Sequence, residues 1–142
     1  MLVRLLYASR ARGPVTQDTL DAILAESRRN NPAQGITGIL CHGGEVYMQV
    51  LEGSREAVNA LYTRIVRDQR HDPVTLLHYE EITERRFAGW TMGHVNLHKV
   101  NPSILLKYSA KPQLDPFATP GCAAMALLEE LMATAQIVGR TG

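Results

Sequence analysis

Two side chains with different hydrogen-bonding abilities, Tyr7 and Gln49, stand in stretches that otherwise have the pattern of buried strands. Tyr7 lies in the apolar run of residues 2–8, and Gln49 lies in the middle of GEVYMQVLEG, residues 44–53. A buried amide costs free energy unless its donors and its acceptor find partners. Taken singly, Tyr7 is explained as a core aromatic and Gln49 as an edge residue facing solvent. Together, on adjacent central strands, they predict a phenol–amide hydrogen bond with amide capacity left for a ligand.

Four further polar residues fall at the ends of two expected helices. Asn30 and Asn31 come at the end of the first helix, where asparagine is common because it tolerates left-handed geometry. The alternative is that a side-chain amide binds the edge of a planar, polar ligand lying between the helices. Arg70 and His71 follow the second helix and could meet a phosphate at the mouth of such a slot.

Aliphatic and aromatic residues suggest the walls of the same slot. Ile23 and Ile65 occupy the inner stripes of the two helices, so they are either core residues or flat-sided neighbours of a ring system. Trp90 and Met92 are spaced by two on the last expected strand, which predicts that both point to one face of the sheet. The alternative for Trp90 is a packed core residue.

The elements that must position these residues follow from periodicity and turn signals. Thr16 and Ser54 are expected N-caps of the two helices, which the polar stretches RRNNP (28–32) and HDP (71–73) end. Gly43 and Gly44 predict a tight hairpin between two strands. The expected strands are 2–8, 35–42, 45–52, 74–82 and 89–95. The order β-α-β-β-α-β-β predicts an α+β, ferredoxin-like sheet with both helices on one face.

Residues 98–142 differ in character from residues 1–97, and we treat them as a C-terminal helical extension. Residues 101–110 indicate a short helix, and a proline-rich connector follows. From Cys122 to Val138 the sequence is so apolar that a helix there cannot face water on most of its circumference. This helix is expected to cover the sheet face left open by the first two helices, or to pack against another copy.

The composition argues against nucleic-acid binders, metal-binding proteins and membrane proteins. A net charge of +1 over 142 residues argues against a nucleic-acid binder, and the two cysteines, Cys41 and Cys122, have no zinc-ligand spacing. No metal site is expected. The amino-terminal run is too short for a signal peptide, and no stretch approaches a membrane span. The sequence therefore predicts a cytoplasmic protein that does not act on a membrane.

The motifs that carry these residues resemble the BLUF family of flavin-binding blue-light sensors. The matching pieces are RLLYAS, NNPAQGITGIL, VYMQVLEG, IVRDQRH and RRFAGWTMG. They stand in family order and spacing over residues 1–97. Because the chain stops about forty residues later, it resembles a short BLUF protein, and no enzymatic output domain is expected. Tyr47 and Met48 depart from the pattern, since phenylalanine is common before the glutamine.

The resemblance implies a set of residues around a flavin. Gln49 would lie between the Tyr7 phenol and the N5/O4 edge of the ring. The other implied flavin neighbours are Asn31 and Asn30 at the pyrimidine end, Ile23 and Ile65 as walls, and Arg70 and His71 toward the ribityl-phosphate end. The implied cofactor is FAD, with FMN or riboflavin as possible substitutes.

The resemblance also implies a mechanism and a mode of action. Blue light would drive electron and proton transfer from Tyr7 through Gln49, leaving the Gln49 amide rotated or tautomerised in a red-shifted, metastable state. Trp90 and Met92 would transmit the change to the C-terminal helices. The expected protein is a non-enzymatic photoreceptor that binds flavin, forms a homodimer and signals to an unidentified protein partner.

Three alternatives remain open at the level of sequence. A flavin sensor that forms a cysteinyl adduct would need a different context around Cys41. An acylphosphatase-like enzyme on the same frame would need a phosphate-binding loop, for which Arg10 and Arg12 offer only part. An interaction module with no ligand is the third, and the ligand content of the purified protein would distinguish it.

Overall fold

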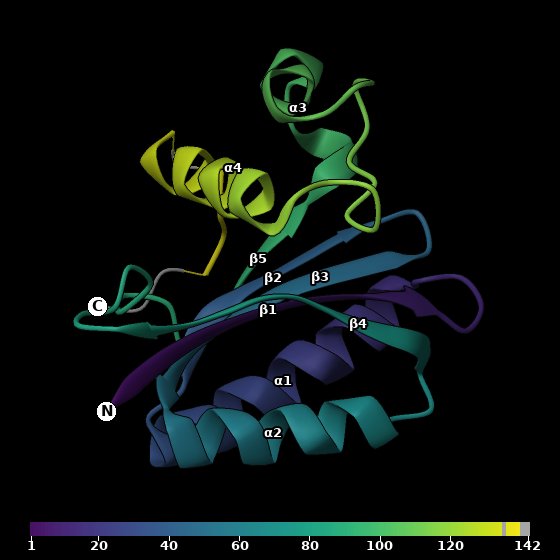
Figure 1. The fold of residues 1–142 in the computed structure, drawn as a ribbon. Coiled ribbons are helices and arrows are strands. Elements are labelled where there is room, and N and C mark those ends of the chain that lie inside the picture. The colour runs from purple at the N-terminus through teal and green to yellow at the C-terminus, as the bar shows by residue number, and fades with distance from the viewer. Residues whose placement is uncertain (135, 140–142) are drawn as a thin grey trace.

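A twisted five-stranded sheet runs through the molecule with helices on both faces (Figure 1). The computed structural model describes residues 1–134 and 136–139. The strands are β1 (Leu2–Ala11), β2 (Thr37–Gly43), β3 (Val46–Ser54), β4 (His71–Ile82) and β5 (Gly93–Asn96). The helices are α1 (Gln17–Gln34), α2 (Arg55–Arg67), α3 (Pro102–Tyr108) and α4 (Gly121–Ala133), with a short 3-10 helix, η1, at Leu97–Lys99.

The strand order is β4-β1-β3-β2-β5. β1 is antiparallel to both β3 and β4, β2 is antiparallel to β3, and β5 is parallel to β2. This is the split βαβ arrangement with one added strand, so the predicted α+β, ferredoxin-like fold is confirmed. The register places Tyr7 on β1 directly opposite Gln49 on β3.

Helices α1 and α2 cover one face of the sheet (Figure 1). Both predicted N-caps are present, because Thr16 Oγ1 accepts a hydrogen bond from the Thr19 backbone and Ser54 Oγ accepts one from Ala57. Their buried apolar residues, among them Leu20, Leu24 and Val58, join one hydrophobic cluster with the alternate residues Val3, Leu5 and Tyr7 of β1. The site residues on the central strands therefore face α1 and α2.

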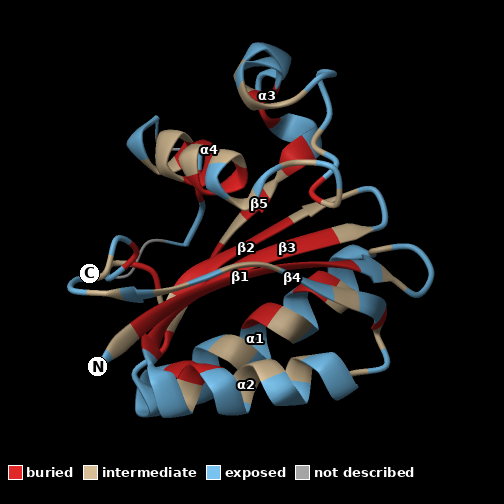
Figure 2. Ribbon diagram, viewed as in Figure 1, coloured by how far each residue is buried: buried red, intermediate tan, exposed pale blue. Residues whose placement is uncertain are grey.

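Helices α3 and α4 lie on the opposite face, and the buried residues of the central strands separate the two layers (Figures 1 and 2). Leu127, Leu128 and Leu131 of α4 are fully buried against Leu6 of β1 and Val50 of β3. The first alternative for this apolar helix is thus confirmed: α4 covers the sheet face that α1 and α2 leave open. None of the helices in the described part of the chain has the length and apolarity that a bilayer crossing requires.

Helix α1 runs further than its polar end suggests. It continues through Pro32 to Gln34, and Gly35 (φ 67°) ends it, with its backbone N–H directed to the Asn31 and Pro32 carbonyl groups. The residue in left-handed geometry is therefore Gly35 and not an asparagine. Asn30 and Asn31 lie within the last two turns of the helix and not at its cap.

Several other predicted boundaries also differ from those observed. β4 begins at His71 instead of Val74, and β5 begins at Gly93 instead of Gly89, because residues 89–92 form a turn and a bend. α4 ends at Ala133, and Val138 returns to the sheet, where its backbone exchanges hydrogen bonds with His94 at 2.9 and 3.0 Å. The remainder of the predicted extension, residues 135 and 140–142, lies outside the described residues.

Candidate functional site

A pocket of about 800 Å³, which includes space open to solvent, lies between α1, α2 and the sheet. Every residue predicted to surround a ligand lines it. These residues are Tyr7, Ile23, Asn30, Asn31, Gln49, Ile65, Arg70 and His71.

A short hydrogen bond joins the two residues at the floor of the pocket. The Tyr7 hydroxyl donates to Gln49 Oε1 at 2.5 Å, and the two side chains are only 3% and 5% exposed. Gln49 Nε2 donates to Met92 Sδ at 3.2 Å. Because this nitrogen carries two N–H groups, one of them is left for a ligand in the pocket.

The surroundings of Tyr7 keep its phenol neutral. Burial is the largest cause that raises its pKa, and the negative charge of Asp68 raises the pKa further, while Arg70 lowers it. If a buried phenol lost an electron and kept its proton, a cation would be left in a low-dielectric site, which costs free energy. Loss of the electron therefore favours loss of the proton as well. Gln49 Oε1 is the acceptor in place for that proton.

Asn31 brings an unpartnered donor into the pocket. The residue is 3% exposed, and its Nδ2 has no hydrogen-bond partner among residues 1–134 and 136–139. Buried polar atoms without partners are rare in native proteins, because each one carries its full desolvation cost. A carbonyl or ring acceptor on a ligand would satisfy this donor. Asn30 lies exposed at the rim beside it.

Ile23 on α1 and Ile65 on α2 give the pocket two half-buried aliphatic walls. Apolar walls with a few polar groups at fixed points are the usual design of a site for a planar cofactor. The pocket thus combines two aliphatic walls with the polar groups of Asn31 and Gln49.

Arg70 lies at the pocket lining and binds two carboxylates. Its Nε is 3.0 Å from both Asp68 oxygens, and a terminal nitrogen is 2.5 Å from Asp68 Oδ2 and 3.3 Å from Glu26 on α1. The hydrogen bond with Arg70 lowers the pKa of Asp68, and the same contact raises the pKa of Arg70. Arg70 therefore connects α1 with the turn after α2.

His71 lines the pocket with both ring nitrogens already engaged. Nε2 lies 2.7 Å from the Ile65 carbonyl oxygen, which can only accept, so Nε2 carries the proton. Nδ1 is then the acceptor for the Ser9 hydroxyl at 2.7 Å. The ring also stands nearly perpendicular to Tyr7 and Tyr47. His71 thus offers a phosphate no free N–H group.

Trp90 and Met92 point to opposite faces, so the prediction of a common face is wrong. Met92 belongs to the cluster under α1 and α2 and touches Gln49, whereas Trp90 belongs to the cluster under α4. The rule that residues two apart share a face holds for an extended strand. It fails here because Trp90 and Met92 precede β5, in a bend, instead of lying on the strand. The segment therefore reaches both layers of the molecule.

Several residues of the pocket were not among the predicted set: Glu26, Ser27, Leu40, Tyr47, Leu61, Arg64 and Asp68. Tyr47 could have been found, because it stands two residues before Gln49 on the same strand and so shares its face. Asp68 could have been found as a carboxylate two residues from Arg70. Glu26 gives no such local signal, because its contact with Arg70 joins distant parts of the chain.

The residues on which the cysteinyl-adduct and acylphosphatase alternatives depend do not line the pocket. Cys41 is fully buried on the α4 side of the sheet, where burial raises its pKa to about 12, and Cys122 is exposed on α4; neither lines the pocket. Arg10 stacks over the Phe117 ring at 4.4 Å, and Arg12 pairs with Asp72 at 3.5 Å. This geometry gives no support to a cysteinyl adduct or to a phosphate loop after β1.

Comparison with known proteins gives consistent matches. The model of the BLUF family, described as sensors of blue light using FAD, matches residues 2–93. Photoactivated adenylate cyclase subunit beta of Euglena gracilis is 40% identical over 92 residues, which are 64% of this chain and 11% of that protein. The blue light- and temperature-regulated antirepressor BluF of Escherichia coli (strain K12) is 32% identical over 119 residues, 80% of this chain and 30% of that protein.

A solved structure extends the similarity over the whole chain. The structure of BlsA in its photo-activated state superposes with a TM-score of 0.82 at 30% identity, covering 100% of this chain and 99% of that one. The similarity thus includes the C-terminal helices and not only the sheet. In contrast, the chain spans only a small part of the cyclase and antirepressor relatives.

Proposed function

This chain belongs to the BLUF family of blue-light sensors, and we propose that Tyr7 and Gln49 are its photoactive pair. A BLUF domain is a sensor module that binds a flavin and signals to partners or output domains; it is not an enzyme. The observation that carries the proposal is the 2.5 Å hydrogen bond from the Tyr7 hydroxyl to Gln49 Oε1 at the floor of the pocket.

For the cofactor we propose FAD, with FMN or riboflavin as substitutes that would leave the photochemistry intact. The residues fit a flavin ring, because an unpartnered Asn31 donor, a free Gln49 N–H and two aliphatic walls meet in one pocket. Asn31 and Asn30 would bind the pyrimidine end, and Ile23 and Ile65 would flank the ring. Arg70 lies at the end of the pocket that we propose for the ribityl phosphate, and His71 lines the pocket wall there.

A bound flavin would supply the absorption of blue light and, once excited, a strong oxidant. The protein's part begins with Tyr7, which would give up an electron to the excited flavin together with its phenolic proton and would take both back when the pair recombines. Gln49 Oε1 accepts that proton across the existing hydrogen bond. The amide is suited to store the change, because its two ends are nearly equal in size and opposite in hydrogen bonding. A rotated or tautomerised Gln49 would be the lit state.

We propose that the signal leaves through Met92 and Trp90 toward α4. Met92 touches Gln49, and Trp90, two residues away, packs in the α4-side cluster, so the segment that holds both connects the two layers. The downstream element would be a separate protein; the similarity to an antirepressor supports this mode of action. We further propose that residues 1–97 are the sensor and residues 98–142 its output surface.

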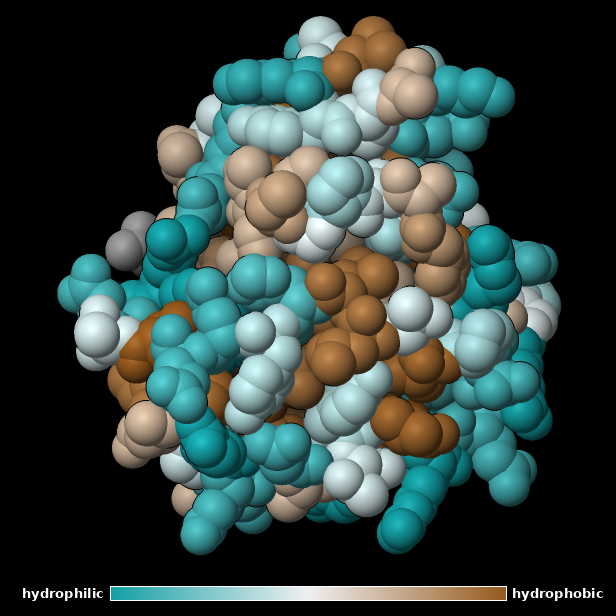
Figure 3. All heavy atoms as spheres, in the orientation of Figure 1, coloured by the Kyte–Doolittle hydropathy of each residue, from teal (hydrophilic) through white to brown (hydrophobic). Residues whose placement is uncertain are grey.

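Self-association is also proposed, in the form of a homodimer. The sheet face is already covered by α4, so support comes instead from the edge strand β4, where Leu76 is 50% and Tyr79 is 38% exposed. Apolar side chains gather near the middle of the face shown in Figure 3.

The exposed free thiol of Cys122 supports a reducing compartment, and we propose the cytoplasm.

The test is an absorption spectrum of the purified protein in the dark, after blue light, and during recovery. A flavin spectrum that shifts slightly to the red and then relaxes would support the proposal. Flavin that bleaches into a covalent adduct or never shifts would contradict the Tyr7–Gln49 mechanism. Colourless protein that does not take up added FAD would favour an interaction module.

A further inference from the structure

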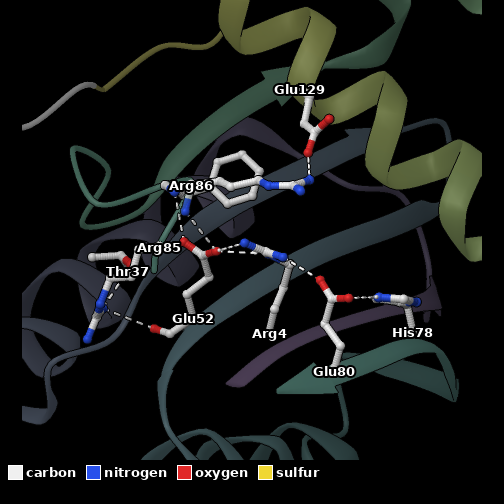
Figure 4. A network of polar contacts seen from close by, with 9 residues as sticks. Arg4, Thr37, Glu52, His78, Glu80, Arg85, Arg86 and Glu129 are labelled. Atoms are coloured by element: carbon white, nitrogen blue, oxygen red, sulfur yellow. Dashed lines mark hydrogen bonds and ion pairs between the residues drawn. The ribbon is translucent and has the colours of Figure 1, made fainter. Parts of the chain in front are cut away.

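A buried ion pair lies on the α4 side of the sheet, away from the pocket (Figure 4). Arg4 on β1 stands directly opposite Glu52 on β3, and the two residues are 2% and 0% exposed. The Arg4 Nε donates to Glu52 Oε2 at 2.8 Å, and a terminal nitrogen lies 2.7 Å from the same oxygen. A charge pair this deep is stable only if its remaining hydrogen-bonding capacity is also satisfied.

The remaining capacity of Glu52 is used by the connection between β4 and β5. Glu52 Oε1 accepts from the Phe87 backbone N–H at 2.7 Å, and Oε2 accepts from the Arg86 backbone N–H at 3.1 Å. Arg85 adds hydrogen bonds to Thr37 Oγ1 at 3.0 Å and to the Glu52 carbonyl at 3.3 Å. One carboxylate on β3 thus holds residues 86 and 87 of this connection in place.

The same connection delivers Met92 to Gln49. The Trp90 N–H donates to the Phe87 carbonyl at 3.0 Å, so the chain turns tightly from Phe87 into residues 90–92. Met92 Sδ then accepts from Gln49 at 3.2 Å. Since Gln49 and Glu52 are three residues apart on one strand and face opposite sides, β3 fixes both ends of the segment 86–92.

The segment also contacts the C-terminal helix. The Phe87 ring is fully buried in the α4-side cluster, and the Arg86 guanidinium pairs with Glu129 on α4 (Figure 4). Any movement of Met92 that follows a change at Gln49 therefore acts on a segment whose other end is held by Glu52 on β3 and which also contacts α4.

We propose that Glu52 is a positioning residue of this sensor: its carboxylate fixes the segment 86–92, and thereby sets how firmly Met92 holds the Gln49 amide. The inference rests on the proposed photochemistry of Tyr7 and Gln49. Glu52 lies on the face of the sheet away from the pocket, yet it would affect the rate at which the lit state returns to the dark state. The reason is that the Gln49 amide must turn back while it is in contact with Met92.

The test compares Glu52→Gln with the wild-type protein, both loaded with flavin and kept well below their unfolding midpoints. The amide retains the size of the carboxylate but places an N–H₂ group among the donors of Arg4 and the segment. The red shift should persist, and dark recovery should be about fivefold faster, the ratio that corresponds to ~1 kcal/mol. Recovery at the wild-type rate would overturn the inference.

Glu80→Gln is the matched control. Glu80 on β4 also pairs with Arg4, and its other ion-pair partner among the described residues is His78 at 3.2 Å, so it belongs to the same network but does not hold the segment (Figure 4). This variant should lose thermal stability while its recovery rate stays at the wild-type value. Equal acceleration in both variants would show a general loss of stability and would overturn the positioning role.

Glu52→Asp serves if the amide variant does not fold. It keeps a negative charge beside Arg4, but a side chain one methylene shorter cannot reach Arg4 and both backbone amides together. Faster recovery is again expected, and an unchanged rate would overturn the inference. A wild-type protein with no photocycle would instead overturn the proposed function itself, and this inference with it.

Discussion

Two sets of buried polar side chains, one on each face of the sheet, differ in how completely their hydrogen bonds are satisfied within the chain. On the α4 side, Arg4 and Glu52 are satisfied by each other, by Glu80 and by two backbone amides. On the α1/α2 side, Asn31 has an unpartnered nitrogen and Gln49 has an N–H to spare. Polar groups that are fully paired within the chain maintain its structure. Polar groups left partly unpaired at a pocket mark the place where a ligand completes the structure.

The largest effect on the unpaired side is expected from Gln49→Leu. Leucine fills a similar volume but can neither accept from Tyr7 nor donate to a flavin, so no relay remains. The variant should bind flavin and show no light-induced red shift in its absorption spectrum. A shift of normal size would mean that the amide is not the relay.

Tyr7→Phe should have nearly the same consequence for a different reason. It keeps the ring that packs in the core and removes the electron and proton donor, so flavin should bind without a photocycle. Tyr62→Phe is the control, because the Tyr62 ring lies 5.9 Å from that of Tyr7 but its residue does not line the pocket. The control should cycle normally; a photocycle in Tyr7→Phe would refute the assignment of the donor.

On the paired side, Arg4→Met should affect stability far more than photochemistry. It leaves the fully buried Glu52 without its counter-charge, and breaking such a pair typically costs about 3–5 kcal/mol of unfolding free energy. Chemical denaturation measures the loss. If the unfolding free energy were unchanged, the Arg4–Glu52 pair would contribute no net stability.

Asn31→Leu should affect flavin binding more than stability. The unfolding free energy of the flavin-free protein should not fall, because the variant removes a buried donor that has no partner in the described part of the chain. Flavin affinity should weaken by about tenfold, the loss of one hydrogen bond to the ligand, ~1.4 kcal/mol. Titration of the apoprotein with FAD measures this. Unchanged affinity would place the ring away from Asn31.

The smallest effect is expected from Asp68→Asn at the pocket mouth. Because Arg70 lowers the folded-state pKa of Asp68, the pair stabilises the protein above the unfolded-state pKa and this contribution disappears as pH falls through the folded-state value. The pair is partly exposed, so the contribution should be about 1 kcal/mol or less. Denaturation of both proteins at neutral and acidic pH should show curves that differ at pH 7 and converge in acid; parallel curves would contradict the coupling.

The contrast between the faces was only partly predictable from the sequence. Alternation in residues 2–8 placed Tyr7 toward α1 and α2, and the split βαβ order made β1 and β3 neighbours, so the Tyr7–Gln49 pair could be expected. These inferences rest on local periodicity, which is strong in central strands.

The Trp90–Met92 segment shows where that reasoning fails. Its position depends on long-range contacts, from Glu52 to the backbone of Phe87 and from Gly38 to the Trp90 carbonyl at 2.9 Å, which no local pattern encodes. The same holds for the contact of Glu26 with Arg70 and for the Arg4–Glu52 pair, whose partners are 44 and 48 residues apart. The contacts that join distant parts of the chain are thus the ones that local sequence patterns predict least well.

The most direct test of the central claim is a light-minus-dark infrared spectrum of protein with isotopically labelled glutamine, compared with unlabelled protein. If Gln49 is the switch, a side-chain amide band should change on illumination, move with the label, and disappear in Gln49→Leu. A photocycle whose infrared difference bands are the same with and without the label would contradict the account, because the change would then lie outside the amide that Tyr7 and Met92 hold.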